Sequence, residues 1–255
     1  GLDGVEIGGS HGYLVAQFWS EHVNDRDDEF GGDLASRCRF ATAIVDRIRE
    51  RVGDDFVVGM RASLGERHER GLSLAETLDV VEQIDGAADL DYWSFVVGSS
   101  STYRSSQFIV PPANTSAEVV ADPVAAVDDR VDGRVIVTSR IDSPDRAERT
   151  LRERPVDVVG MTRAMIADPE LVRKTREGDR GDVTPCVACN QGCIGRYHEG
   201  LPIRCTVNPV TGRERTHTHG RVDPAAESRS VVVVGGGPAG MIAASTAARR
   251  GHDVT

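Results

Sequence analysis

Four of the five cysteines in this chain lie close together, between Cys186 and Cys205. Disulfides in a chain of this size would rarely be so crowded, so the pattern indicates metal ligation in a reducing compartment. The four residues are Cys186, Cys189, Cys193 and Cys205, separated by two, three and eleven residues. Structural zinc sites usually pair two CxxC turns, whereas three close cysteines and one distant cysteine are more typical of a cubane iron–sulfur cluster. The spacing favours a cluster and leaves zinc open.

A glycine motif near the end of the chain follows four valines, at 231–234, and precedes a run of small helix-forming residues. This strand–turn–helix context is the one that the dinucleotide-binding fingerprint requires. Gly235 permits the tight turn, Gly237 lets the backbone approach a pyrophosphate, and Gly240 allows the helix to lie close to the strand. The acidic ribose ligand is expected about 20 residues further on. We therefore expect only the start of a domain that binds FAD, or ADP or NAD(P)H.

The elements that must position these motifs follow from the apolar periodicity, in which short β-branched runs alternate with amphipathic stretches. The expected strands are 4–7, 56–63, 92–98, 134–140 and 156–162, and the expected helices are 34–52, 74–88, 117–131, 144–154 and 168–176. Five strand–helix units in series imply parallel strands covered by helices, in a closed barrel or an open doubly wound sheet. Polar residues gather at the strand ends, where barrel active sites lie, so we favour a barrel.

Composition and charge limit the partners of the protein. The hydrophobic share of 39% and the charged share of 27% are those of a globular chain. A formal net charge of −10 argues against a nucleic-acid partner. No apolar stretch approaches the roughly 18 residues of a membrane-spanning helix, and no signal peptide precedes the first apolar run. We expect a soluble, cytoplasmic protein that acts on a small molecule, with its oligomeric state open.

Four stretches of the chain resemble the multidomain branch of the Old Yellow Enzyme family, which includes 2,4-dienoyl-CoA reductase, trimethylamine dehydrogenase and N-methyl amine demethylases. They are 4–18, 24–40, 160–169 and the cysteine loop with its following Asn208-Pro209. The resemblance covers essentially the whole chain. It implies FMN in the barrel and a [4Fe-4S] cluster, rather than zinc, on the four cysteines. It also places the first residues at the fourth barrel strand, so that three units of an eight-unit barrel are expected upstream.

The expected fold class is therefore α/β, with the C-terminal five βα units of a TIM barrel. Residues 1–180 would form the partial FMN-binding barrel and 181–212 the cluster-binding segment. A linker at 213–229 would lead to the start of a Rossmann-like FAD- or NAD-binding domain at 230–255. We expect this part of the enzyme to be inactive alone, because the family's other flavin contacts would lie upstream.

The resemblance implies catalytic roles for two residues after the first strand. Tyr13 stands where ene-reductases of the family have the tyrosine that protonates the substrate carbon, which a phenol can do if its anion is stabilised nearby. His11 stands where a polar residue faces substrate or flavin, and its imidazole could donate a hydrogen bond to an enolate oxygen. Gly8 is a departure, because many relatives carry His or Tyr there.

The resemblance also implies flavin contacts at the ends of later strands. Arg61 matches the arginine that faces the flavin pyrimidine, where positive charge stabilises the reduced anion. The loops after the seventh and eighth barrel strands bind the FMN phosphate, and here they carry Ser139–Arg140 and Thr162–Arg163. Relatives usually have Gly in place of Ser139.

Several further residues have two possible interpretations. Trp93 lies near the position of an aromatic wall for cationic amines, although a tryptophan in a strand is more often core. Tyr103 and Arg104 are expected to border the substrate pocket. Cys38 is expected to be a buried thiol, and His217 and His219 to be solvated linker residues.

Three functions remain open from the sequence. The first is NAD(P)H:flavin oxidoreduction of the 2,4-dienoyl-CoA reductase kind, in which FMN and the cluster deliver electrons to an activated C=C bond, such as that of an enoyl thioester. The second is oxidative demethylation of an N-methyl amine, with electrons leaving through the cluster to a partner. The third is an inert scaffold with a structural metal.

Overall fold

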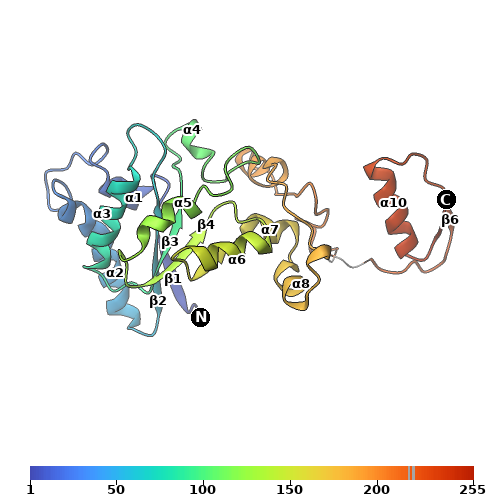
Figure 1. Ribbon diagram of the computed structural model, residues 1–255, viewed down its shortest axis with the longest axis horizontal. Coiled ribbons are helices and arrows are strands. Elements are labelled where there is room, and N and C mark those ends of the chain that lie inside the picture. The colour runs from blue at the N-terminus through green and yellow to red at the C-terminus, as the bar shows by residue number, and fades with distance from the viewer. Residues whose placement is uncertain (218, 220–221) are drawn as a thin grey trace.

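A parallel sheet of five strands organises the larger part of the protein. The computed structural model describes residues 1–217, 219 and 222–255 (Figure 1). The strands are β1 (Gly4–Gly9), β2 (Val57–Ser63), β3 (Tyr92–Val96), β4 (Arg134–Thr138) and β5 (Val158–Gly160), in that spatial order. Doubly wound sheets reverse their strand order at a switch point. The sequential order of these strands is instead that of neighbouring strands in a barrel, and the α/β alternation expected from the sequence is confirmed.

Most of the helices expected from the sequence are present, with ends set by local capping. The helices beside the sheet are α1 (Leu14–Trp19), α2 (Leu34–Val52), α3 (Leu74–Asp85), α6 (Pro144–Glu153), α7 (Thr162–Ala167) and α8 (Leu171–Glu177). At the start of α2, Asp33 accepts a hydrogen bond from the backbone of Ser36, and Gly53 ends the helix at a φ of 77°. A capping box of Ser73 and Glu76 starts α3. No helix in the described ranges is long and apolar enough to cross a membrane.

The helix expected over 117–131 is much shorter than predicted. Only α5 (Ala121–Val124) and the 3₁₀ turn η1 (Ala125–Val127) form there. Pro123 has no N–H and is tolerated only in the first turn of a helix, so the helix cannot begin much earlier. Asp128 is not helical and Asp129 has a φ of 61°, which ends the element. The helix predicted over the whole of 117–131 was therefore wrong, because Pro123 and the break at Asp128–Asp129 limit the element.

The core lies between the sheet and its helices. Trp93 and Phe95 on β3 are fully buried and stack with ring centroids 6.0 Å apart. The indole Nε1 of Trp93 donates a hydrogen bond to Asp85 Oδ1 at 2.8 Å. Trp93 is therefore a core residue held against α3, and it does not form a wall of a substrate pocket.

A small β–α–β unit at the end of the chain stands apart from the sheet in Figure 1. It consists of β6 (Ser230–Val231), α10 (Pro238–Arg249) and β7 (Asp253–Val254), with β6 and β7 parallel. The four valines were expected to form one strand, but only Val231 of the four belongs to β6. Val232 and Val234 are exposed. A Cβ added to Gly240 would lie 2.0 Å from the carbonyl oxygen of Gly235, so only glycine fits at this helix–turn contact.

Candidate functional site

The loops that follow β1, β2 and β3 meet at the carboxyl edge of the sheet. His11 forms a parallel bridge with Ser99, and its carbonyl oxygen accepts a hydrogen bond from the backbone N–H of Ser100 at 2.9 Å. The backbone N–H of His11 donates to Oγ of Ser63, the last residue of β2, at 2.9 Å. His11, which follows β1, is thereby fixed by contacts with the ends of two further strands, β2 and β3.

The ring of His11 is buried, and its surroundings determine which ring nitrogen carries the hydrogen. Its Nδ1 lies 3.1 Å from the carbonyl oxygen of Gly98. A carbonyl can only accept, so Nδ1 carries the hydrogen and Nε2 of the neutral ring is an acceptor. Burial lowers the pKa of His11, the Gly98 contact opposes this, and the charge of Arg61 adds to it. The hydrogen bond donation expected from His11 therefore requires the protonated ring or the other tautomer, both of which this setting disfavours.

Tyr13 lies at the N-terminus of α1 with its side chain 57% exposed. Its ring meets that of His11 edge to face, with centroids 6.3 Å apart. Gly12, between the two, has a φ of 72°, and a Cβ there would lie 2.6 Å from Ser99 Oγ and 2.7 Å from Ser101 Oγ. Glycine at this position lets the loop lie directly on the loop after β3. The phenol is left open to a small molecule at the edge of the sheet.

Arg61 lies on β2 and pairs with Glu6 of β1 at 2.7 Å. Its Nε is buried and has no hydrogen-bond partner among the described residues. Beside it, a Cβ added to Gly8 would meet nothing within 4 Å. An unused buried donor next to open space is suited to an additional acceptor, such as a carbonyl oxygen of a bound ring system.

The loop after β4 shows a similar unused donor. The hydroxyl of Ser139 is buried, and it has no hydrogen-bond partner in the described part of the chain. Arg140 turns away, because its Nη1 donates to the carbonyl oxygens of Pro112 and, at 2.8 Å, of Thr115, and its Nε pairs with Asp142 at 3.1 Å. The backbone and hydroxyl of this loop are therefore available to an anion, whereas the Arg140 side chain is already engaged.

The loop after β5 also has one exposed residue and one arginine whose side chain is already engaged. Thr162 is exposed at the start of α7. Arg163 points to the cysteine segment, and its Nη1 donates to the carbonyl oxygen of Pro111 at 2.7 Å and to Asn190 Oδ1 at 2.8 Å. The resemblance implied a place at the FMN phosphate for Arg163, and in the structure its guanidinium lies beside the cysteines.

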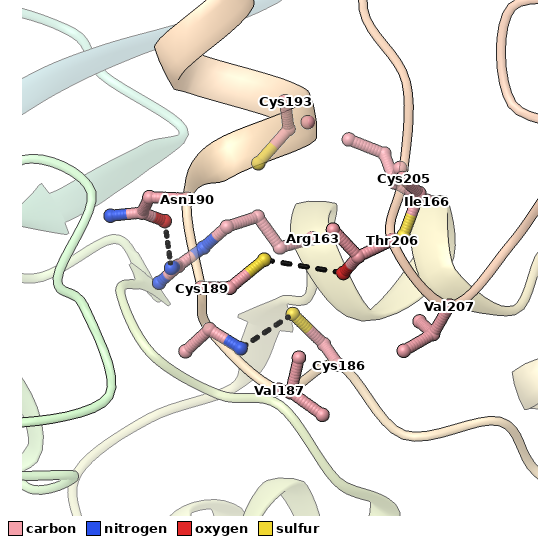
Figure 2. A pocket seen from close by; sticks show the side chains of 12 residues that line it. Arg163, Ile166, Cys186, Val187, Cys189, Asn190, Cys193, Cys205, Thr206 and Val207 are labelled. Carbon is pink, nitrogen blue, oxygen red and sulfur yellow. Dashed lines mark hydrogen bonds between the residues drawn. The ribbon is translucent and has the colours of Figure 1, made fainter. Parts of the chain in front are cut away.

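The four clustered cysteines line one hollow (Figure 2). All are free thiols, and Arg163, Ile166 and Asn190 are among the other residues that line the hollow. The short π-helical turn η3 (Gln191–Gly195) carries Cys193. A Cβ added to the neighbouring Gly192 would lie 2.6 Å from the carbonyl oxygen of Arg204. Glycine at this position therefore lets the segment that carries Cys205 lie directly against the turn that carries Cys193.

The thiols have unequal surroundings. Thr206 Oγ1 lies 3.3 Å from the sulfur of Cys189, and this hydrogen bond lowers the pKa of Cys189. Burial raises the pKa of Cys186, although the backbone N–H of Ala188 lies 3.4 Å from its sulfur. Over the described residues, no group of three or more His, Cys, Asp or Glu side chains is arranged to hold one metal ion. Four thiols that line one hollow are ligands of the kind that bind a metal ion or an iron–sulfur cluster.

A buried ion pair next to the start of the cysteine segment could not be predicted from the sequence. Asp168 is completely buried and accepts hydrogen bonds from Lys174 Nζ at 2.6 Å and from the backbone of Thr184 at 2.9 Å. His219 lies 3.9 Å from the same carboxylate and is partly buried, so the expectation of a solvated residue was wrong for His219, while His217 is exposed. The only signal in the sequence was that Lys174 is the sole lysine.

Comparison with known proteins identifies the larger part of the chain. Residues 1–181 match the NADH:flavin oxidoreductase / NADH oxidase family. The N,N-dimethylglycine/sarcosine dehydrogenase of Chromohalobacter salexigens is 39% identical over 256 residues, which is 100% of this chain and 37% of that protein. The NADH oxidase of Thermoanaerobacter brockii is 38% identical over 257 residues, 99% of this chain and 38% of that protein.

A solved structure of a 2-naphthoyl-CoA reductase is similar over 99% of this chain and 38% of its own, with a TM-score of 0.82 and 32% identity. The chain thus spans well under half the length of these relatives. The named relatives are oxidoreductases, and the family expected from the sequence motifs is confirmed. The chain belongs to the NADH:flavin oxidoreductase / NADH oxidase family.

Proposed function

We propose that this chain is part of an FMN- and [4Fe-4S]-dependent oxidoreductase that reduces an activated C=C bond with electrons from NAD(P)H. The observation that carries the proposal is the exposed phenol of Tyr13, held beside His11 at the carboxyl edge of the sheet. In such an enzyme the flavin supplies hydride transfer and the cluster supplies single-electron transfer.

FMN fits the unused donors at the sheet edge. Arg61 Nε would donate to the pyrimidine end of the flavin, and the hydroxyl of Ser139 to its phosphate. The guanidinium of Arg61 would also place positive charge beside the reduced ring. The backbone of Arg140 and the exposed Thr162 complete the proposed phosphate loop, whereas Arg163 is assigned to the cysteines. The upstream barrel units would supply the remaining flavin contacts.

A [4Fe-4S] cluster fits the cysteine hollow. A cubane needs four thiolates set around its corners, and Cys186, Cys189, Cys193 and Cys205 line one hollow. The Thr206 hydroxyl and the Ala188 N–H would donate to ligand sulfurs, as is usual around such clusters. We assign residues 181–212 to cluster binding and 1–180 to the flavin barrel.

Tyr13 and His11 would have different roles toward the substrate. Tyr13 is positioned to give a proton to the substrate carbon from its exposed hydroxyl. His11, with its hydrogen on Nδ1, presents Nε2 as an acceptor. We therefore propose that His11 orients a donor group, either of the substrate or the Tyr13 hydroxyl itself, rather than stabilising an enolate oxygen.

The C-terminal unit is proposed as the start of an FAD- or NAD(P)H-binding domain at 230–255, after a linker at 213–229. Gly235 has a φ of 108°, and a Cβ added to Gly237 would meet nothing within 4 Å. This glycine turn at the start of α10 leaves space for a pyrophosphate.

The proposed function is tested by anaerobic bleaching of the flavin in the full-length protein. NAD(P)H should bleach the flavin, and an enoyl or dienoyl thioester should then restore its colour. Failure of NAD(P)H to bleach the flavin, or of every activated alkene to restore it, would contradict the proposal. Zinc in place of iron and labile sulfide would support the scaffold alternative.

Oxidation of an N-methyl amine is the second candidate, because the dimethylglycine/sarcosine dehydrogenase of Chromohalobacter salexigens is similar over the whole chain. Trp93 does not supply an aromatic wall for a cationic amine, because its side chain is buried in the core. Bleaching by an N-methyl amine, but not by NAD(P)H, would establish this second function.

A further inference from the structure

A hollow rich in arginine lies at the carboxyl ends of β2 and β3, away from the proposed flavin contacts. Its lining includes Arg67, Arg70 and Arg104, with His68, Glu69 and Phe108. It encloses about 1090 Å³, counted with its opening to solvent. Three cations around one space are notable in a chain whose formal net charge is −10.

The charges of the three arginines are not neutralised by carboxylates. Over the described residues, none of the three forms an ion pair, although Glu69 lies on the same lining. Arg70 donates from Nη2 to the carbonyl oxygen of His22 at 3.1 Å, and the guanidinium of Arg67 lies over the Phe108 ring, 5.8 Å from its centroid. Neutral partners hold the side chains of Arg67 and Arg70 in place and leave their positive charge to a ligand.

The loop that presents Arg67 and Arg70 is closed on itself. The backbone N–H of Glu66 donates to the carbonyl oxygen of Leu72 at 2.8 Å, and the N–H of Leu72 donates to Glu66 Oε2 at 3.2 Å. The Glu66 carboxylate is thus buried, and its Oε2 lies 3.4 Å from Nε2 of His68, which lines the hollow. Arg67 has a φ of 62°, an uncommon backbone conformation for a residue other than glycine, which the closed loop enforces.

The turn that presents Arg104 is fixed to the same loop. It is the short helix α4 (Tyr103–Ser106), in which Ser105 is buried and its hydroxyl donates to the carbonyl oxygen of Glu66. That hydroxyl also accepts from the backbone N–H of Ser99 at 2.8 Å. Since Ser99 pairs with His11, the arginine hollow and the Tyr13 site share one rigid wall.

We propose that this hollow binds an oxyanion of the substrate, a carboxylate or a phosphate, and so orients the reacting atoms toward Tyr13. Arginine guanidinium groups bind both anions through paired N–H donors. The proposal rests on the proposed function for the reaction itself, but anion binding does not require turnover. It makes the substrate class an organic acid or a phosphorylated thioester.

The test is calorimetric titration of the oxidised, flavin-loaded, full-length protein with small probes. Benzoate is compared with neutral benzamide, and adenosine 3′,5′-bisphosphate with neutral adenosine. We expect one anion of the two pairs to bind roughly tenfold or more tightly than its neutral partner, as charge-assisted hydrogen bonds require. Preference for benzoate assigns a carboxylate, and preference for the bisphosphate assigns the phosphate of a coenzyme. Equal binding within both pairs would overturn the proposal.

Variants locate the binding to this hollow. Arg104→Gln and Arg67→Gln should each reduce the preference for the anion severalfold, and Arg51→Gln is the matched control. Arg51 is an exposed arginine at the end of α2, just before β2 begins and therefore at the opposite edge of the sheet. An equal effect of Arg104→Gln and Arg51→Gln would overturn the assignment. Because flavin bleaching is measured separately, loss of anion preference in a protein that still bleaches would refute only this inference.

Discussion

Arg163 Nη1 donates a hydrogen bond to Asn190 Oδ1 at 2.8 Å, and this contact joins the sheet to the cysteine segment. Arg163 follows β5, whereas Asn190 lies between Cys189 and Cys193 at a φ of 60°. Asn190 Nδ2 also donates to the carbonyl oxygen of Val110 at 2.7 Å. The guanidinium therefore lies among the cysteines because the loop of Asn190 is folded onto the end of the sheet.

Arg163→Gln should shift the midpoint potential of the proposed cluster to more negative values, on the order of tens of millivolts. Addition of an electron is favoured by a nearby cation, and Arg163 lines the hollow beside the thiols. The measurement is a redox titration of the full-length protein followed by electron paramagnetic resonance. Asn190→Gly keeps both the charge and the unusual backbone conformation, so it should shift the potential less.

The matched control for Arg163 is Arg152→Gln, an exposed arginine on α6. An iron-replete Arg163→Gln protein with an unchanged potential would show that its charge does not reach the cluster.

Replacement of Cys193 by alanine should remove most of the iron and labile sulfide, whereas replacement of Cys38 should remove none. Cys38 is 1% exposed on α2 and does not line the cysteine hollow, and burial raises its pKa to about 12, so we expect it to remain an unligated thiol. The cost of Cys38→Ala is a loss of core contacts of about 1 kcal/mol. The readout is iron and sulfide per purified protein. Zinc at one equivalent in the parent protein would contradict the cluster.

Tyr13→Phe should slow reoxidation of the flavin by an activated alkene by roughly 10²- to 10⁴-fold, the usual contribution of a general acid. Reduction by NAD(P)H should be unchanged, because the phenol takes no part in that step. Stopped-flow absorbance measures the two half-reactions separately. Tyr197→Phe is the control, since Tyr197 is 66% exposed on the short helix Arg196–His198 and does not line the cysteine hollow. Equal reoxidation rates for parent and Tyr13→Phe would mean that another group supplies the proton.

The parts of the fold that local signals determine could be predicted from the sequence. The helix at 34–52 was predicted to its last residue, because Asp33 caps its start and Gly53 ends it. Over 117–131 the apolar pattern was clear, yet Pro123 and the Asp128–Asp129 break decided the backbone. Periodicity reports which side is buried and does not report where a helix stops.

Side-chain directions at the site could not be predicted in this way. The strand-end positions of Arg61, Ser139 and Arg163 follow from alternation along the chain, but the partners of Arg163 come from residues 111 and 190, far away in the sequence. The tautomer of His11 likewise depends on a carbonyl at Gly98. Such contacts arise only when loops from several strands meet.

Asp168→Asn should destabilise the folded protein by about 3–5 kcal/mol, because it leaves the Lys174 ammonium without its buried partner. Lys174→Met in the Asp168→Asn background should recover part of the loss, and the two single variants together with the double variant give the coupling energy of the pair. Urea unfolding of the full-length protein, followed by tryptophan fluorescence, gives the free energies. A loss below about 1 kcal/mol would place the pair among ordinary surface ion pairs.

The Asp168 carboxylate should also make the stability of the folded protein depend on pH in a defined direction. Burial alone would raise the pKa of Asp168, but its hydrogen bonds from Lys174, Thr184 and Glu170 outweigh burial and lower it. A carboxyl whose pKa is lower in the folded state stabilises the protein above its unfolded pKa of about 3.9, and this contribution is lost as the pH falls through the folded pKa. The destabilisation caused by Asp168→Asn should therefore be full at pH 7 and shrink below about pH 4. If the difference between parent and variant were the same at pH 7 and at the lowest pH where both fold, Asp168 would not be ionised in the folded protein.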